Sequence, residues 1–421
     1  MGCRQWLQFA AWASVLWRCG HSLSLPRAAR ERGSFQSVYN ALRKGPTRTV
    51  NVPEDVELRI SAISDLHVDH PANFRWLEKI IAAKTAEKAA DTVGNRRYYE
   101  VVLVAGDVSS RLSVMRDVFG VLKDGFDAVV FAAGNHDLWC VGKEDEQLGV
   151  QDSFDKFGRV VDLCDELEVD VRPLRLFHRG DYYPVVPLQS WYHGDWDREP
   201  DLPNEVTAPL YANVPSFERR WSDFRFCRWP TSLVKREDLV RLDSGPVLAE
   251  AFGELTIGAC GGRELSDLHE GRSPKLCFSL SHFLPRKELC PEKRFLVEPL
   301  LAKVVGSAVL ERQVQELQPD IHVFGHSHIP YDIELSDVRY VQWPLGYPRE
   351  QSRQCHRTAK AGPLCLFATD EGVRSTQTTY WGDYYVNNER DSSETSLAPW
   401  VLEYAYSRQR RLDDIAREAE K

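Results

Sequence analysis

Several short apolar stretches of this chain each end in side chains that could bind a metal ion. The stretch 127–133 is rich in valine and alanine and runs directly into Gly134-Asn135-His136-Asp137. The same arrangement recurs where 57–64 meets Asp65-Leu66-His67, where 99–105 meets Gly106-Asp107, and where 321–324 meets Gly325-His326-Ser327-His328. Short, bounded apolar runs of this kind predict buried strands. In open α/β proteins, ligands bind beyond the carboxyl ends of such strands.

A fifth stretch, 275–281, ends at His282 and completes a set of candidate metal ligands. The set comprises two carboxylates, one amide oxygen and four imidazoles: Asp65, His67, Asp107, Asn135, His282, His326 and His328. Mixed nitrogen and oxygen ligands favour Mn, Fe or Zn over Mg or Ca. Seven ligands exceed the needs of one ion and fit two ions that share a carboxylate. Two such ions, about 3.5–4 Å apart, can activate a water and clamp a phosphoryl group for in-line displacement.

The elements that position these residues alternate between strands and helices. Apolar faces at helical spacing predict helices over 73–90, 112–123, 152–168 and 298–315. Further strands are predicted over 182–191, 331–335, 338–343 and 363–368. This alternation predicts parallel strand pairing with helices on both faces.

The segment 194–272 interrupts this alternation. It contains Trp196, Trp221 and Trp229, several prolines and many charged residues. Long irregular segments of compact domains are usually functional or disordered, and the aromatic content argues against disorder. We therefore expect an insertion or cap over the site.

Composition limits the classes of partner. The 421 residues carry a formal charge of −9, and residues 1–50 hold eight Lys or Arg and one acid, so the remainder is about −16. So acidic a body is a poor non-specific binder of long nucleic acids. No apolar stretch reaches the roughly 18 residues of a transmembrane helix. The ten cysteines show no Cys-x-x-Cys spacing, so a disulfide framework is not expected.

The two ends of the chain differ in composition from its middle. Residues 1–50 are rich in arginine and suit a targeting segment, either for a plastid or other organelle or for secretion. A disordered extension of a cytoplasmic protein is the alternative. The catalytic body is expected over 51–385, followed by a charged, helix-prone tail over 386–421.

The strand-end motifs, taken in order, resemble a known family. Asp65-x-His67, Gly106-Asp107, the block 134–137, the lone His282 and Gly325-His326-x-His328 look like the five blocks of the calcineurin-like metallophosphoesterase superfamily, spanning 57–330. The resemblance implies a four-layer α/β/β/α sandwich with two mixed sheets face to face. It also implies two divalent transition-metal ions, Mn, Fe or Zn.

The resemblance assigns a role to each motif residue. It implies that one ion is bound by Asp65, His67 and His328, that Asp107 bridges, and that the second ion is bound by Asn135, His282 and His326. His136 would steady the transition state or protonate the leaving oxygen, and Asp137 would orient its ring. A neighbouring carboxylate favours imidazolium and fixes its orientation.

Subfamily markers narrow the resemblance. Purple acid phosphatases have a tyrosine where this chain has Ser110, and protein Ser/Thr phosphatases continue differently after Asp107 and end the later block in Glu rather than Asp137. Stretches such as 190–193, 281–286 and 341–350 resemble a plant and algal branch of the superfamily, which supplies no substrate.

The resemblance implies metal-dependent hydrolysis of phosphoesters, in which a metal-bound hydroxide attacks in line. We expect a phosphomonoesterase acting on a phosphorylated small molecule or a phosphoprotein. A phosphodiesterase or nuclease on the same site, and a non-catalytic scaffold that binds a partner, are the alternatives. The scaffold is disfavoured because all seven ligands and His136 are present.

Three further residues are candidates for binding substrate. Arg111 and Arg349 carry planar guanidinium groups that pair well with phosphate oxygens. Each could instead be a surface or salt-bridged arginine. His193 follows a predicted strand and suits a substrate-side or capping role.

Overall fold

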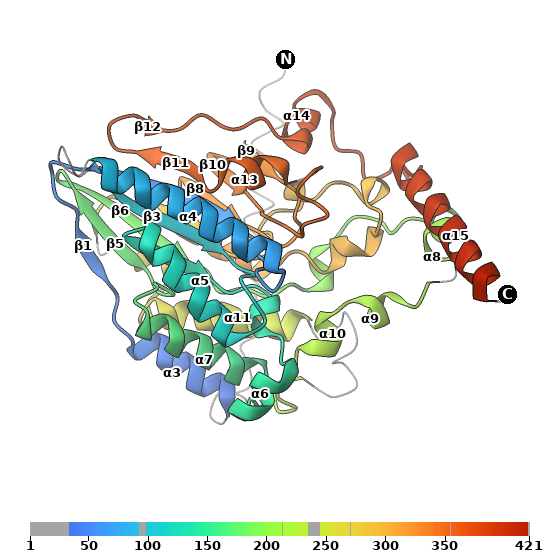
Figure 1. Ribbon diagram of the computed structural model, residues 1–421, viewed down its shortest axis with the longest axis horizontal. Coiled ribbons are helices and arrows are strands. Elements are labelled where there is room, and N and C mark those ends of the chain that lie inside the picture. The colour runs from blue at the N-terminus through green and yellow to red at the C-terminus, as the bar shows by residue number, and fades with distance from the viewer. Residues whose placement is uncertain are drawn as a thin grey trace, which may run out of the picture.

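Two sheets pack face to face in the computed structural model, with helices on their outer sides (Figure 1). The structure describes residues 33–91, 98–212, 214–234, 245–269, 271–353 and 355–419. The five-stranded sheet has the order β12-β11-β2-β3-β4. Its strands are β2 (Glu57–Ser64), β3 (Tyr98–Ala105), β4 (Ala128–Ala132), β11 (Leu364–Ala368) and β12 (Gly372–Val373).

The seven-stranded sheet has the order β1-β5-β6-β7-β8-β10-β9. Its strands are β1 (Thr49–Asn51), β5 (Leu174–His178), β6 (Asp181–Pro187), β7 (Phe278–Leu280), β8 (Ile321–Phe324), β9 (Tyr331–Leu335) and β10 (Val338–Gln342). Both sheets mix parallel and antiparallel pairs: β2, β3 and β4 are parallel neighbours, whereas β11 runs antiparallel to β2.

The helices divide between the outer layers and the edges. Those nearer the N-terminus are α3 (Ser34–Lys44), α4 (Pro71–Asp91), α5 (Leu112–Gly125), α6 (Gly142–Leu148) and α7 (Ser153–Glu166). Those in the middle are α8 (Asn204–Tyr211), α9 (Phe217–Arg220), α10 (Asp223–Phe226) and α11 (Gly245–Ala259). The rest are α12 (Ala308–Leu317), α13 (His356–Ala361), α14 (Tyr380–Asn387) and α15 (Pro399–Ala419). None of the helices in the described part of the chain is long and apolar enough to cross a membrane.

Successive side chains of β3 point to opposite faces of its sheet and so belong to two separate parts of the hydrophobic core. Val101 and Leu103 face the other sheet and pack in one cluster with Phe278. Val102 and Val104 point the opposite way, into the cluster that contains Phe119 of α5. Because successive side chains of a strand point to opposite faces, one apolar strand serves both layers. The four-layer sandwich expected from the sequence is therefore confirmed.

Strand register brings the chemically interesting residues to one edge. Ser64 pairs with Ala105, and Ala105 pairs with Ala132, so β2, β3 and β4 end side by side. The ends of β7 and β8 are also neighbours, and the backbone N–H of Gly325 donates to the carbonyl of His282. The loops that leave both sheets therefore meet above their carboxyl ends.

The prediction of one continuous helix over 298–315 is wrong for the first half of that range. The structure has a short 3₁₀ helix at Pro299–Lys303 and then α12, which begins only after Ser307. The Ser307 hydroxyl accepts a hydrogen bond from the backbone N–H of Leu310, which is an N-cap that fixes this start. The sequence analysis missed this break because apolar residues continue at helical spacing on both sides of it.

The predicted boundary between a targeting segment and the body at residue 50 is also wrong. Residues 1–32 lie outside the described residues, but α3 already packs Phe35, Val38 and Leu42 into the main core. β1 then pairs in parallel with β5. The folded body therefore begins by Ser34, because three apolar residues at helical spacing sit within the arginine-rich region.

The segment 194–272 is not a single cap. In its last part, α11 buries Leu248, Phe252 and Leu255 in the outer helical layer. Its middle part, with α9 and α10, passes beside the strand ends. Within the tail expected over 386–421, α15 is the predicted helix, and it also packs Val401 and Ala405 against Phe295 in a small cluster.

Candidate metal centre

Five of the predicted ligands have a left-handed backbone. The positive φ angles are 54° at Asp65, 43° at His67, 54° at Asp107, 74° at His326 and 54° at His328. These are half of the ten non-glycine residues with positive φ among the described residues. Such conformations cost about 1–3 kcal/mol each and cluster at functional sites. The strand ends are therefore built to turn these side chains toward one point.

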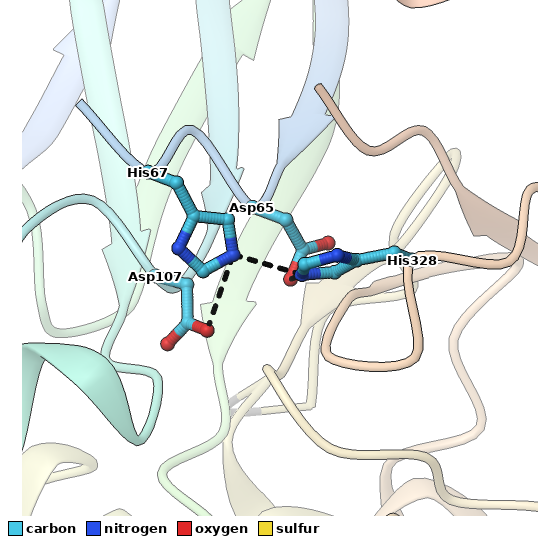
Figure 2. A group of neighbouring side chains, drawn as sticks. All are labelled: Asp65, His67, Asp107 and His328. Atoms are coloured by element: carbon cyan, nitrogen blue, oxygen red, sulfur yellow. Dashed lines mark hydrogen bonds and ion pairs between the residues drawn. The ribbon is translucent and has the colours of Figure 1, made fainter. Parts of the chain in front are cut away.

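Four of these side chains form the first group of ligand atoms: Asp65, His67, Asp107 and His328 (Figure 2). The Nε2 atoms of His67 and His328 lie 2.8 Å apart. His67 Nε2 is 3.7 Å from Asp107 Oδ2, and His328 Nε2 is 3.6 Å from Asp65 Oδ1. All four residues are buried. Their ligand atoms lie close enough together to hold one cation.

Asp107 also belongs to the second group, with His282 and His326. His282 Nε2 lies 3.4 Å from Asp107 Oδ1 and 3.2 Å from His326 Nδ1. The Asn135 amide oxygen is 3.0 Å from each of these two imidazole nitrogens. Asp107 thus presents one carboxylate oxygen to each group, which is the arrangement that a shared ligand of two ions requires.

Hydrogen bonds on the far side of three imidazoles orient the other ring nitrogen toward the two ligand groups. His282 donates from Nδ1 to the carbonyl of Ala105, and His326 donates from Nε2 to the carbonyl of Val304, each at 3.0 Å. His328 donates from Nδ1 to Glu350 Oε2 at 2.8 Å. Such outer partners fix the tautomer and orientation of ligand histidines.

A carboxylate from the middle segment orients Asn135. The side-chain N–H₂ of Asn135 donates to Asp223 Oδ1 at 2.8 Å, which leaves its oxygen directed at His282 and His326. Asp223 also accepts from the indole N–H groups of Trp139 and Trp221. The segment expected to form a cap therefore supports the second group from behind.

Asp137 does not orient His136, so this prediction is wrong. Its carboxylate accepts hydrogen bonds from four backbone N–H groups, those of Asp107, Val108, Ser109 and Gly134, at 2.8–3.1 Å. Side chains of adjacent residues do not face each other in a helical turn, and Asp137 follows His136 in a short 3₁₀ helix. Asp137 instead ties the loop after β3 to the loop after β4.

His136 stands at the mouth of the centre. Its ring stacks on Trp139 with centroids 3.5 Å apart, and its Nε2 lies 3.8 Å from Asp107 Oδ2. The Tyr347 hydroxyl is 3.4 Å from the same nitrogen. A cavity of about 450 Å³ opens here, lined by His67, Asp69, His70, Ser110, Arg111, His136, Trp139 and Tyr347. A substrate entering this cavity would meet His136 and Tyr347 directly above the shared carboxylate.

Burial controls the charge of the ligand set. Burial and the neighbouring imidazoles lower the pKa values of His67 and His326 well below the ordinary range. Burial also lowers the pKa of His282 to about 4. For Asp107, burial and the nearby carboxylates of Asp137 and Asp65 raise the pKa. Neutral imidazoles are the form that binds metals, and crowded carboxylates are relieved by a cation. The donor set therefore fits two divalent transition-metal ions.

A family model for calcineurin-like phosphoesterases matches residues 58–330. This chain belongs to that family.

A curated relative of the chain is the acyl-carrier-protein phosphodiesterase PptH of Mycobacterium tuberculosis. It is 24% identical over 297 residues, which cover 70% of this chain and 79% of the relative. The crystal structure of phosphopantetheinyl hydrolase PptH from the same organism superposes with a TM-score of 0.51 at 20% identity. That match covers 71% of this chain and 93% of the other. This structural likeness supports the fold. Together with the family, these findings identify the chain as a metallophosphoesterase, a hydrolase of phosphoric esters.

The three predicted substrate residues of this calcineurin-like phosphoesterase have different surroundings. Arg111 lines the mouth cavity, with its Nε 3.3 Å from Asp69. Arg349 is 81% exposed and lies over the Tyr347 ring, 5.5 Å from its centroid. Of the two roles predicted for His193, the structure supports capping, because its Nε2 accepts from the backbone N–H of Ala308 at the start of α12. His193 does not line the mouth cavity, so its predicted substrate-side role has no support there.

Sequence reasoning missed three residues of the site: Asp223, Glu350 and Tyr347. Asp223 is 88 residues from its partner Asn135, and Glu350 is 22 residues from His328. The one available signal was the stretch 341–350, which resembled a branch of the family. Its residues Tyr347 and Glu350 both contact the ligand histidines.

Proposed function

We propose that this protein is a two-metal phosphodiesterase. The observation that carries the proposal is the pair of ligand groups that share Asp107 beneath an open cavity. When bound, two such ions lower the pKa of a coordinated water and neutralise charge on the phosphoryl oxygens.

The chain's own residues would then position the substrate. The carboxylate of Asp107 reaches both groups, and Asp137 fixes the backbone on both sides of it. His136 and Tyr347 project their polar atoms into the same opening, 3.4 Å apart. We assign these two side chains to hydrogen bonds with the phosphoryl oxygens or with the leaving oxygen, where charge develops during the reaction.

The charge at the mouth favours a diester over a monoester. Of the described residues that line the cavity, Arg111 alone carries a permanent positive charge, and Asp69 lies beside it. Arg349, outside the cavity, lies beside Glu350. A phosphomonoester carries up to two charges at neutral pH, whereas a diester carries one. We therefore place the diesterase above the monoesterase that the sequence alone led us to expect.

The relative suggests which diester to test. Its name describes a phosphodiesterase acting on acyl carrier protein, and the related structure is named a phosphopantetheinyl hydrolase. We propose that this chain hydrolyses the phosphodiester that joins a prosthetic arm to a carrier protein. The water oxygen bonds to phosphorus as the P–O bond to the carrier protein breaks, and a proton from the water passes to the leaving oxygen, so the arm leaves as a phosphomonoester and the carrier regains its alcohol.

The test is a substrate panel on protein loaded separately with Mn, Fe, Zn or Mg. Bis-p-nitrophenyl phosphate, p-nitrophenyl phosphate and holo-acyl carrier protein are compared, and the loss of the arm is followed by mass spectrometry. We expect turnover of both diesters, which is lost in the Asp107→Asn variant. Turnover of the monoester alone would contradict the proposal and restore the phosphomonoesterase.

A further inference from the structure

A second, larger cavity lies one turn away from the metal-site mouth. It has a volume of about 700 Å³, and Glu350 lines it, whereas Tyr347 lines the mouth. The backbone N–H of Glu350 donates to the carbonyl of Tyr347, so a single turn separates the two openings. A third cavity of about 560 Å³ shares Trp343, His356, Arg357 and Thr378 with the second. We call these two adjoining cavities the α13 groove.

One wall of the α13 groove is aromatic and exposed. Val297, Tyr380 and Trp400 line it with exposed fractions of 43%, 67% and 43%. These are three of the nine large hydrophobic side chains exposed among the described residues. Trp381 and Phe295 line the same wall. Exposed apolar side chains gathered at one hollow indicate a binding surface rather than chance exposure.

A second part of the groove lining, which we call the basic wall, carries cations. Residues 349–360 contain four exposed permanent cations, Arg349, Arg353, Arg357 and Lys360, in a chain whose net charge is −9. The acid in this stretch is Glu350, whose carboxylate accepts from His328 and lies 4.0 Å from the guanidinium of Arg349, so Arg353, Arg357 and Lys360 are the cations that it does not pair. Arg353 and Arg357 line the larger cavity, and Lys360 lines the smaller one. Both cavities of the groove therefore have a cation in their lining, whereas Arg349 lies outside them, over the Tyr347 ring.

Two further acids line the groove, and they do not cancel this charge. Glu298 is occupied by an ion pair with Arg220 and a hydrogen bond from Tyr211. Asp383 lies on α14, within the aromatic wall. The basic wall, from Arg353 to Lys360 of α13, therefore remains a separate positive surface.

We propose that the α13 groove docks the protein part of the substrate, through a segment with acidic side chains on one side and apolar side chains on the other. This inference rests on the proposed function, because it places the scissile phosphodiester at the metal-site mouth, one turn away from the groove. Paired electrostatic and apolar walls suit an amphipathic protein segment, and charged rims steer association. A nucleic acid is less well matched, because its affinity depends on many phosphate contacts and the body is acidic.

The first test reverses the basic wall. The double variant Arg353→Glu/Arg357→Glu is compared with Arg116→Glu/Lys123→Glu, an equal charge change on α5, whose side chains pair with Glu166 and Glu168. With holo-acyl carrier protein as substrate, we expect KM to rise about tenfold or more in the groove variant and to depend less on salt. The control variant should retain the wild-type KM, and both should hydrolyse bis-p-nitrophenyl phosphate as wild type does.

The second test addresses the aromatic wall. Tyr380→Ser removes a lining side chain, whereas Val386→Ser removes an 81% exposed side chain of the same helix that does not line the groove. We expect weaker binding of fluorescently labelled holo-acyl carrier protein, measured by anisotropy, only for Tyr380→Ser. Anisotropy measures carrier binding even if the protein hydrolyses no carrier protein. The experiment therefore distinguishes failure of the proposed function from failure of the docking proposal.

Three outcomes would overturn the groove proposal. One is an equal loss of activity on the small diester, because the groove residues would then serve the fold or the metal centre. Another is unchanged carrier binding in both groove variants. The third is a groove-dependent affinity for a 20-nucleotide single-stranded RNA, or for vesicles containing anionic lipid, that exceeds the affinity for the carrier.

Discussion

The histidines of the two ligand groups have different kinds of hydrogen-bond partner. In the second group, His282 and His326 donate to backbone carbonyls, which no substitution of a side chain removes. In the first group, His328 donates to the carboxylate of Glu350. A carboxylate behind an imidazole makes it a more basic ligand. We therefore expect the first group to bind its ion more tightly, and the second to depend more on the fold.

The largest effect should come from the residue that the two groups share. Asp107→Asn removes the charge that both ions would use, while asparagine tolerates the positive φ of 54° at this position. We expect both ions to be lost and phosphodiester hydrolysis to fall by more than about 100-fold, beyond the effect usual for an outer partner. Elemental analysis and turnover of bis-p-nitrophenyl phosphate measure this. Retention of two tightly bound ions would show that Asp107 is not shared.

Asp223→Ala should weaken the second group alone. It removes the acceptor that orients Asn135 and leaves the indole N–H groups of Trp139 and Trp221 without that partner. Loss of an outer partner typically costs about 10–100-fold in metal affinity or activity. Metal titration by calorimetry should show one site weakened and the other unchanged. If both sites weakened equally, the two groups would not be separately supported.

Glu350→Gln should weaken the first group by less than Asp223→Ala weakens the second. Glutamine can still accept the hydrogen bond from His328, so mainly the charge is lost. The same calorimetric titration should show a loss near the lower end of the range of about 10–100-fold, confined to the other site. No change in either site would mean that the carboxylate charge does not distinguish the groups.

Tyr347→Phe should leave both ions in place and slow the reaction. The ring packs on His67, with centroids 4.5 Å apart, and phenylalanine keeps this contact while losing the hydroxyl near His136. The loss of one hydrogen bond corresponds to about a three- to tenfold decrease in kcat/KM. Steady-state kinetics on metal-loaded protein provide the measurement, and unchanged metal content is the control. A full loss of activity would place Tyr347 nearer to the chemistry than we propose.

Leu42→Ala should affect stability and not the metal centre. Leu42 lies on α3, is fully buried, and packs in the main core. Truncation of a buried leucine costs about 2–5 kcal/mol of unfolding free energy. Urea unfolding should show this loss, while kcat/KM of the folded protein stays at the wild-type value. An unchanged midpoint would contradict our placement of α3 in the body.

The gathering of the seven candidate ligands could be predicted from the sequence because they share a local signal. Each directly follows an apolar strand, and the carboxyl ends of parallel strands lie at one edge of the sheet. The structure brings all seven side chains together. The supporting residues carry no such signal, since Asp223 and Glu350 lie in irregular segments whose positions depend on tertiary packing.

Local proximity also misled the interpretation in two places. Asp137 follows His136, which suggested a pair, yet the turn directs its carboxylate to the backbone of the loop after β3. The arginine-rich composition of residues 1–50 hid the apolar face of α3. In both places the deciding interaction joins segments far apart in the chain, and neither composition nor spacing reports such contacts.

The left-handed backbone at five ligands has a consequence for how this protein can change. Each of these residues places a candidate metal ligand, and to do so its backbone holds a positive φ that most side chains disfavour. Replacement of one by glycine would relieve that strain and abolish a ligand at once. Stability and catalysis are therefore opposed at these positions, so a descendant that no longer needed the reaction could gain thermal resistance by discarding its ligands.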